Sequence, residues 1–279
     1  MNLLFFTIFA KKMNKKSRFS VFFVCTSAVF SFVIYYSSNP CYKPATEQTG
    51  LSVVNNIDDT IRIAYIGDSW AYRHKKVNCI IDSIIFNSTG KEVLIRNVGI
   101  GGLVSKEIYY SIFNKKEFKD VIEWGPDFCY VSAGINDTNK KSGSSNYAEN
   151  MRLIITLLLD NGIVPIIQEI PYYDISYAFY HMKYVFMLRS LRSMLWTWSS
   201  LNCIDDYTKA FNNMIEENHW QKDVIVIRRD SWNPEGYRGH KNIYTEDRMH
   251  LNQNGYFVLD SCIASHIVIY LRDNYSQSF

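Results

Sequence analysis

Two kinds of apolar pattern alternate along the chain after residue 60. Short runs rich in β-branched residues have the pattern of buried strands, and they lie at residues 61–66, 91–98, 127–133, 163–170 and 224–228. Between and after them, apolar residues at helical spacing predict helices over 70–86, 106–124, 145–160, 205–219 and 252–273. Strands that alternate with helices predict an α/β fold with a central five-stranded parallel sheet covered on both faces.

The N-terminal region has a different pattern. Residues 1–18 carry five basic side chains and no acidic one, and residues 19–36 follow without a charge. This is the form of a signal peptide or signal anchor, and the basic flank predicts an inside N-terminus. Because no clear cleavage site follows, we expect a membrane anchor with an extracytoplasmic domain, or a secreted or periplasmic protein if the leader is cleaved. Residues 37–60 are polar and predict a linker, which leaves 61–273 as the folded domain.

The overall charge is misleading about partners. The formal net charge is +3, but without the leader's five basic residues there are 25 basic residues against 27 acidic ones. The domain therefore gives no reason to expect a nucleic-acid partner. The cysteines show no C-x-x-C pair or metal-ligand spacing, and the apolar neighbours of Cys79 and Cys129 favour buried free thiols.

Residues 171–204 form a long aromatic-rich insertion where a short connection is expected. Three interpretations stay open: a helix that buries one face on the domain, an aromatic wall that stacks on sugars, or a helix at a membrane surface. The residues at helical spacing are Tyr177, Tyr180, Tyr184, Met187, Leu191, Met194 and Trp198, and the basic residues of the third interpretation are Lys183, Arg189 and Arg192.

Polar clusters follow the first three predicted strands and precede the last helix. They are Gly67-Asp68-Ser69-Trp70, the run from Asn97 to Gly102, Gly134-Ile135-Asn136-Asp137, and Asp247-Arg248-Met249-His250. Since ligands of open α/β sheets bind at the carboxyl ends of the strands, we expect these clusters to meet in one site. We expect Asp68 and Asp137 to be structural.

The clusters contain the groups that nucleophilic catalysis needs. Ser69 lies between a strand and a helix N-terminus, where developing negative charge is favoured. His250 is the candidate base, and Asp247 is close enough in sequence to orient its ring and stabilise the imidazolium. The backbone N–H groups of Ser69 and Gly102 and the side-chain amide of Asn136 are candidate donors to an oxyanion.

These four motifs, in this order, resemble those of the SGNH hydrolase (GDSL-type esterase) superfamily over residues 61–272. The residues that match the superfamily's four name-giving positions are Ser69, Gly102, Asn136 and His250, and Asp247 completes its triad. The spacing from Asn97 to Gly102 matches the family's second block. Trp70 departs from the family, which has Leu there, and we expect it to reshape the pocket beside the nucleophile.

The resemblance implies a flavodoxin-like three-layer α/β/α sandwich, no metal or other cofactor, and acyl-ester chemistry. With an extracytoplasmic location and many aromatic residues, an acylated polysaccharide or smaller acylated sugar is the favoured substrate, and removal of O-acetyl groups is the simplest reaction. The alternatives are an O-acyltransferase of envelope polysaccharide that uses the same acyl-enzyme, a lipase or lysophospholipase, and a non-catalytic glycan-binding module. The sequence leaves acyl length and oligomeric state open.

Overall fold

The structure is a computed structural model of the 279-residue chain. It describes residues 20, 23–32, 43–54, 59–77, 79–174, 187 and 204–275. The chain divides into two compact units, Met1–Tyr42 and Lys43–Phe279. In the first unit, the structure describes an apolar helix at Phe23–Phe32, within the predicted anchor. The second unit contains the predicted α/β domain.

A single five-stranded parallel sheet forms the middle of the second unit. Its strands are β1 (Ile61–Gly67), β2 (Val93–Gly99), β3 (Phe128–Ser132), β4 (Val164–Gln168) and β5 (Ile225–Ile227), in the order β2-β1-β3-β4-β5. Every pairing is parallel. All five predicted strands are confirmed, and the order is that of flavodoxin-like sheets.

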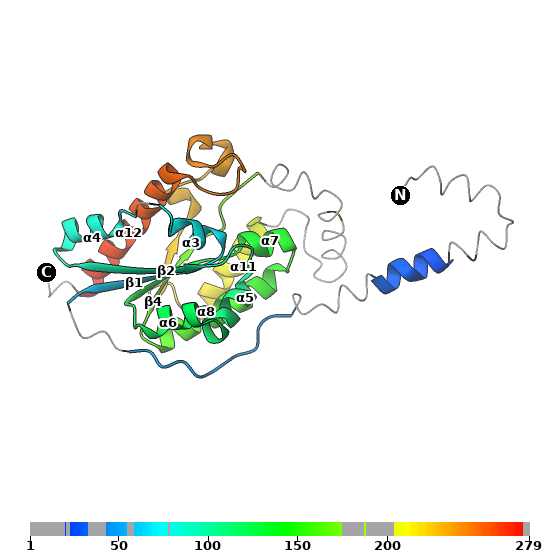
Figure 1. Cartoon of the computed structure of the whole chain (residues 1–279), viewed down its shortest axis with the longest axis horizontal. Helices are drawn as coiled ribbons and strands as arrows, with labels where there is room; N and C mark the ends of the chain where they lie inside the picture. Colours follow the sequence, from blue (N-terminus) through cyan, green and yellow to red (C-terminus); the bar gives the residue numbers. More distant parts are fainter. Residues whose placement is uncertain are drawn as a thin grey trace. The chain divides into compact units, whose positions relative to one another are not determined.

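Helices cover both faces of this sheet, which gives the predicted three-layer sandwich (Figure 1). One layer contains α4 (Ile81–Thr89) packed on α12 (Gln253–Tyr275), and the other contains α5 (Ser105–Asn114), α6 (Lys116–Glu123), α8 (Ser144–Asp160) and α11 (Ile204–Glu217). The short helices α3 (Ser69–His74) and α7 (Ile135–Lys140) follow β1 and β3. Three 3-10 turns, Arg229–Ser231, Gly236–Arg238 and Lys241–Ile243, lie between β5 and α12.

The prediction of one continuous helix over 70–86 is wrong, because the structure has two helices there. Helix α3 buries Trp70 and His74 and packs on β1 and β2. Helix α4 instead buries Ile81 and Ile85 and packs against α12. The apolar faces of α3 and α4 pack against different elements, so the chain turns between the two helices.

The helix predicted over 106–124 is also divided, into α5 and α6. Lys115 separates them with an extended backbone (φ −118°, ψ 121°). Helix α7 lies in a segment for which the sequence analysis predicts no helix, since its sequence is too short and too polar to show a helical period.

Residues 43–54, predicted as part of a linker, lie against the domain. The N–H of Ala45 donates to Asn150 Oδ1 at 2.8 Å, and the N–H of Gln48 donates to the Tyr109 hydroxyl at 2.8 Å. The compact unit therefore begins at Lys43 rather than at residue 61. The backbone donors of this polar segment are satisfied by side chains, a pattern that hydropathy does not reveal. Residues 37–42 and 55–58 of the predicted linker lie outside the described residues.

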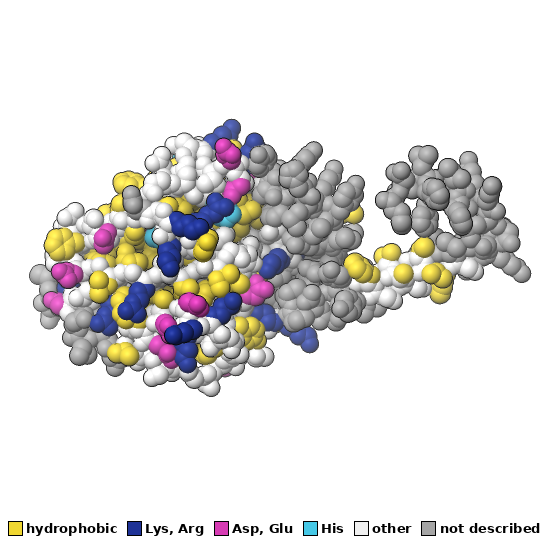
Figure 2. Space-filling view, viewed as in Figure 1, with side chains coloured by type: hydrophobic (Ala, Val, Ile, Leu, Met, Phe, Trp, Pro, Cys, Tyr) yellow, Lys and Arg dark blue, Asp and Glu magenta, His cyan; other side chains and the backbone are white. Residues whose placement is uncertain are grey.

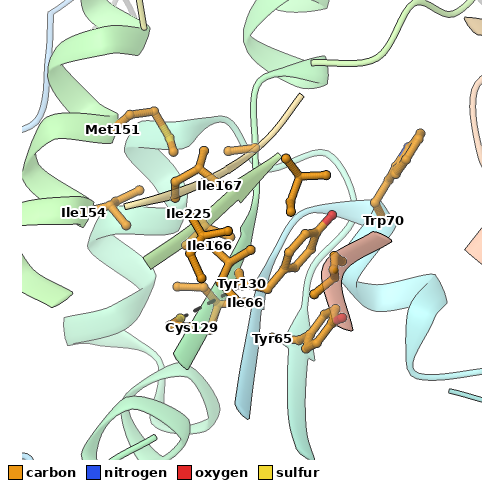
Figure 3. Packing of buried hydrophobic residues seen from close by; sticks show 14 of the residues in the cluster. Tyr65, Ile66, Trp70, Cys129, Tyr130, Met151, Ile154, Ile166, Ile167 and Ile225 are labelled. Atoms are coloured by element: carbon orange, nitrogen blue, oxygen red, sulfur yellow. Dashed lines mark hydrogen bonds between the residues drawn. The ribbon is translucent and has the colours of Figure 1, made fainter. Parts of the chain in front are cut away.

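The core fills the space between the sheet and its helices, and Figure 3 shows its central part. The side chains labelled there come from three strands, their neighbour β5, and helix α8: Tyr65, Ile66, Cys129, Tyr130, Ile166, Ile167, Ile225, Met151 and Ile154, with Trp70 above the end of β1. Cys129 is a buried free thiol, as predicted, and Cys79 is a half-buried one. Helix α12 is apolar and long enough to cross a membrane, but it buries Leu259, Ile263 and Ile267 in this core, so we interpret it as a core helix.

Candidate functional site

The parallel register brings the ends of three strands to one level. Gly67, the last residue of β1, pairs with Gly99 on β2 and with Ser132 on β3. A Cβ atom on Gly67 would lie 2.3 Å from the Ser132 carbonyl oxygen, so the glycine is required by the close approach of the two strands. The chain leaves β1 towards β2 and then returns to β3, which makes this edge the topological switch point where ligands bind.

Ser69 is the first residue of α3 and follows this edge directly. Asp68 is the N-cap, and its side chain accepts a hydrogen bond from the Trp70 N–H at 2.9 Å. The short turn from β1 into α3 leaves the Ser69 side chain half-buried at the rim of the sheet.

His250 and Asp247 come from the loop before α12, and the structure brings both to Ser69. His250 Nε2 lies 2.8 Å from the Ser69 hydroxyl, across a sequence separation of 181 residues. His250 Nδ1 lies 2.7 Å from Asp247 Oδ2. The loop reverses in a turn in which the N–H of Arg248 donates to the Thr245 carbonyl at 3.0 Å and Arg248 has a positive φ of 57°. Serine, imidazole and carboxylate therefore form one hydrogen-bonded chain.

The surroundings of Asp247 keep its carboxylate charged. Its Oδ1 accepts hydrogen bonds from the Thr245 hydroxyl (2.7 Å) and from the N–H groups of Met249 (3.0 Å) and His250 (2.9 Å). Burial favours the neutral acid, but these bonds and the one to the His250 ring outweigh it and hold the pKa of Asp247 well below its usual range. Arg73, which the sequence did not single out, adds a guanidinium 3.3 Å from Oδ2.

Asn136 and the loop after β2 lie at the same rim. Asn136 is in the first turn of α7, and its Nδ2 donates to Asp68 Oδ2 (3.1 Å) and to the Leu103 carbonyl (3.0 Å). Gly102 has a positive φ of 84°, and a Cβ on its neighbour Gly101 would lie 3.9 Å from Ser69 Cβ. The oxyanion roles of Ser69, Gly102 and Asn136 stay predictions. Both amide hydrogens of Asn136 are already bound, so an oxyanion would share or replace one partner.

Asp68 has a larger part in this arrangement than the sequence indicated. Its Oδ1 also accepts the Ser132 hydroxyl at 2.9 Å, so one carboxylate links the turn before Ser69 to β3 and to Asn136. Burial raises the pKa of Asp68 to about 6, although hydrogen bonds from Trp70 and Ser132 act in the opposite direction. This linking role of Asp68 is recognised from its complete burial in the structure, and no sequence motif indicates it.

Asp137 fits its expected structural role. Its two oxygens accept hydrogen bonds from the backbone and the hydroxyl of Ser105, at 2.9 and 2.6 Å, which fixes the loop after β2 to α7. The expectation for Trp70 was wrong. Its side chain is 1% exposed and packs edge-on against Trp232 and Tyr256, so it belongs to the core beneath the rim.

The described residues contain one group of possible metal ligands, His74, Cys79 and Asp260, and it includes none of Ser69, Asp247 and His250. The chain of hydrogen bonds at the rim therefore contains an alcohol, a base and a carboxylate, which suits nucleophilic attack and proton transfer by the protein's own side chains.

No protein-family model and no curated protein sequence matches the chain. Solved structures are similar to it at low sequence identity. A GDSL-like lipase from Bacteroides thetaiotaomicron is 16% identical with a TM-score of 0.51, over 77% of this chain and 91% of that one. An acetyl xylan esterase is 16% identical with a TM-score of 0.51, over 74% and 100%. A lipase/acylhydrolase from Enterococcus faecalis is 16% identical with a TM-score of 0.51, over 75% and 96%. These likenesses confirm the predicted fold class.

The raised pKa of Asp68 predicts a pH-dependent stability. The folded state holds the proton of the Asp68 carboxyl more tightly than the unfolded state does. The free energy of unfolding therefore decreases as the pH rises from about 4 to about 6. We expect the free energy of unfolding of the wild type, relative to Asp68→Asn, to fall by about 2 kcal/mol between pH 4 and pH 7 in urea titrations. Asp82→Asn, at an exposed carboxyl on α4, is the control. A constant difference between wild type and Asp68→Asn across this range would contradict the prediction.

Proposed function

We propose that this chain, which has the SGNH hydrolase fold, is a serine esterase in which Ser69, His250 and Asp247 are the catalytic triad. The observation that carries the proposal is the pair of short hydrogen bonds at His250, 2.8 Å to the Ser69 hydroxyl and 2.7 Å to Asp247. Nucleophile, base and orienting carboxylate are thus within direct reach of one another without rearrangement.

In the first half of the reaction, Ser69 Oγ attacks the carbonyl carbon of the ester while His250 Nε2 takes the hydroxyl proton. The anionic Asp247 stabilises the imidazolium that forms. The backbone N–H groups of Ser69 and Gly102 and the Asn136 amide donate to the oxyanion. The tetrahedral intermediate then collapses, and the alcohol leaves with the proton that His250 returns to its oxygen.

In the second half, water replaces the alcohol. His250 takes a proton from the water as its oxygen attacks the acyl-enzyme, and the same donors hold the second oxyanion. Collapse of this intermediate releases the acid and returns the proton to Ser69 Oγ. The triad ends in its starting state, so no external cofactor enters the balance.

We propose an O-acetylated carbohydrate outside the cytoplasm as the substrate. Among similar structures, one is of an acetyl xylan esterase, another is of an acetyl-xylooligosaccharide esterase, and others are of lipases, so the fold alone does not choose between acetyl and long acyl chains. The start of the aromatic-rich insertion is attached to the loop that carries His250, because Asp174 binds Arg248 through a 3.1 Å ion pair and a backbone hydrogen bond of 3.2 Å. The many aromatic residues in the sequence of the insertion are what favours a sugar. The rest of the insertion, 175–203 apart from Met187, lies outside the described residues, and its three interpretations stay predictions.

The chemistry predicts that Ser69→Ala removes esterase activity. We expect the full chain to hydrolyse p-nitrophenyl acetate and the variant to lose at least about 10³-fold in kcat, since the nucleophile is absent. Ser83→Ala, at an exposed serine on α4, is the matched control and should keep full activity. A fluorophosphonate label should map to Ser69 in the wild type. Equal turnover by wild type and Ser69→Ala would refute the proposal, and a wild type without turnover or label would indicate a binding module.

The substrate proposal predicts a preference for short acyl chains. Across p-nitrophenyl esters from acetate to palmitate, we expect kcat/KM to be highest for acetate, and acetylated oligosaccharides to lose acetyl groups in mass spectrometry. Ser69→Ala is the control. A maximum at long chains would favour a lipase, and a gain of acyl mass on a glycan acceptor would favour an acyltransferase.

We also propose that the N-terminal segment anchors the chain in a membrane. The helix Phe23–Phe32 exposes Phe23, Val29 and Phe30 by 63% or more, and Figure 2 shows apolar side chains along it. On the face of the second unit in Figure 2, by contrast, Lys and Arg side chains are interspersed with Asp and Glu. We expect the full chain to sediment with membranes, to resist alkaline carbonate and to dissolve in detergent. Release by carbonate would contradict an integral anchor.

A further inference from the structure

A buried polar cluster joins three elements behind the nucleophile helix. His74 ends α3, Cys79 lies in the turn before α4, and Asp260 is in the middle of α12. One nitrogen, the sulfur and one carboxylate oxygen of these residues lie within 4.8 Å of one another. His74 and Asp260 are 4% and 0% exposed, and Cys79 is half-buried. The proposed esterase reaction uses none of these side chains.

The cluster leaves buried polar atoms without partners. His74 Nε2 lies 2.8 Å from Asp260 Oδ1, its Nδ1 lies 3.2 Å from Asn97 Nδ2, and its ring stacks on Tyr65 at 4.5 Å. Among the residues that the structure describes, each of these three neighbours has a buried oxygen with no hydrogen-bond partner: Asp260 Oδ2, Asn97 Oδ1 and the Tyr65 hydroxyl. Since buried polar groups are nearly always satisfied, three unpartnered oxygens on the neighbours of one ring point to a place where a polar ligand would be favourable.

We propose that His74, Cys79 and Asp260 bind a zinc ion. Imidazole, thiolate and carboxylate are the ligand types of zinc, whereas calcium and magnesium prefer oxygen alone. The ligand atoms of a tetrahedral zinc site lie roughly 3.3–3.8 Å apart. Here the His74 and Asp260 atoms are 2.8 Å apart and all three atoms are within 4.8 Å, so small side-chain rotations create the site. Water is the expected fourth ligand.

The neighbours of His74 are suited to metal binding. Because the Asn97 amide nitrogen faces Nδ1, we place the ring proton on Nε2, which donates to Asp260 when no metal is bound. When Nε2 binds the metal, the ring proton moves to Nδ1, and a rotated Asn97 amide presents its unpartnered Oδ1 as the acceptor. Burial and the nearby Asp260 raise the pKa of the Cys79 thiol, so it is the bound cation that would make the thiolate favourable, with the proton released to solvent.

A metal here would connect the elements that carry the triad. It would fix the end of α3, whose first residue is Ser69, to α12, which begins three residues after His250. The site is therefore structural, and we expect it to stabilise the fold without taking part in the chemistry.

The test is metal binding by the full chain in detergent, with Co²⁺ as the spectroscopic probe and Zn²⁺ as the competitor. We expect the wild type and Ser69→Ala to bind one equivalent of Co²⁺, with a thiolate-to-cobalt charge-transfer band that Zn²⁺ abolishes. Zinc about 100-fold above its Kd should raise the unfolding midpoint by about 5–10 °C. Cys79→Ser and Asp260→Asn should lose the band and the shift. Cys262→Ser, which removes another half-buried thiol near a histidine, is the matched control and should keep both.

The outcomes separate the alternatives. No stoichiometric uptake by a folded wild type, with no change in the midpoint, would overturn the proposal and leave a buried water as the partner of these atoms. A band that survives in Cys79→Ser, or that disappears in Cys262→Ser, would also overturn it. Because Ser69→Ala is inactive under the proposed function but should still bind metal, failure of one proposal is distinguishable from failure of the other.

Discussion

The register between β1 and its two neighbours is the constraint on which the site depends. The pairing of Gly67 with both Gly99 and Ser132 aligns the C-terminal ends of β1, β2 and β3. A slip of one residue would turn the side chains of β1 to the opposite faces and move Ser69 away from the loops that accompany it. The missing side chain of Gly67 permits this register, since any Cβ there would overlap the Ser132 backbone. Asp68 then binds Ser132 and Asn136, so the register of the sheet is transmitted to the rim by hydrogen bonds.

The second requirement is that a distant loop returns to Ser69, and α12 provides this. The Tyr256 hydroxyl donates to the Trp70 carbonyl at 2.9 Å, and His74 binds Asp260 at 2.8 Å, so α12 holds α3 at both ends. His250 lies just before α12, and Ser69 begins α3. The two contacts between these helices therefore restrain the distance between Ser69 and His250. The aromatic core around Trp70 therefore supports the contact between Ser69 and His250 from below the rim.

The sequence predicted the sheet and the meeting of Ser69, Asp247 and His250, because strand runs and short motifs at strand ends are local signals. It did not predict the breaks at Lys115 and between α3 and α4, since the apolar period continues on both sides of each turn and only the packing partners change. Residues 43–54 were missed because hydrogen bonds rather than apolar side chains attach much of this segment. The cluster of His74, Cys79 and Asp260 has no sequence signal, since Asp260 joins the other two only through the α3–α12 contact.

Two carboxylates at this rim have opposite pKa shifts, and the difference explains their roles. Asp247 is partly exposed and surrounded by donors, so it stays an anion that can stabilise an imidazolium. Asp68 is completely buried, and burial raises its pKa despite the donors it meets. An asparagine at position 68 would avoid the buried charge, but its amide would present a donor to one of the neighbours, all of which donate. Only a carboxylate accepts from Trp70, Ser132 and Asn136 at once, so the fold retains a destabilising charge to keep the Asn136 amide in place.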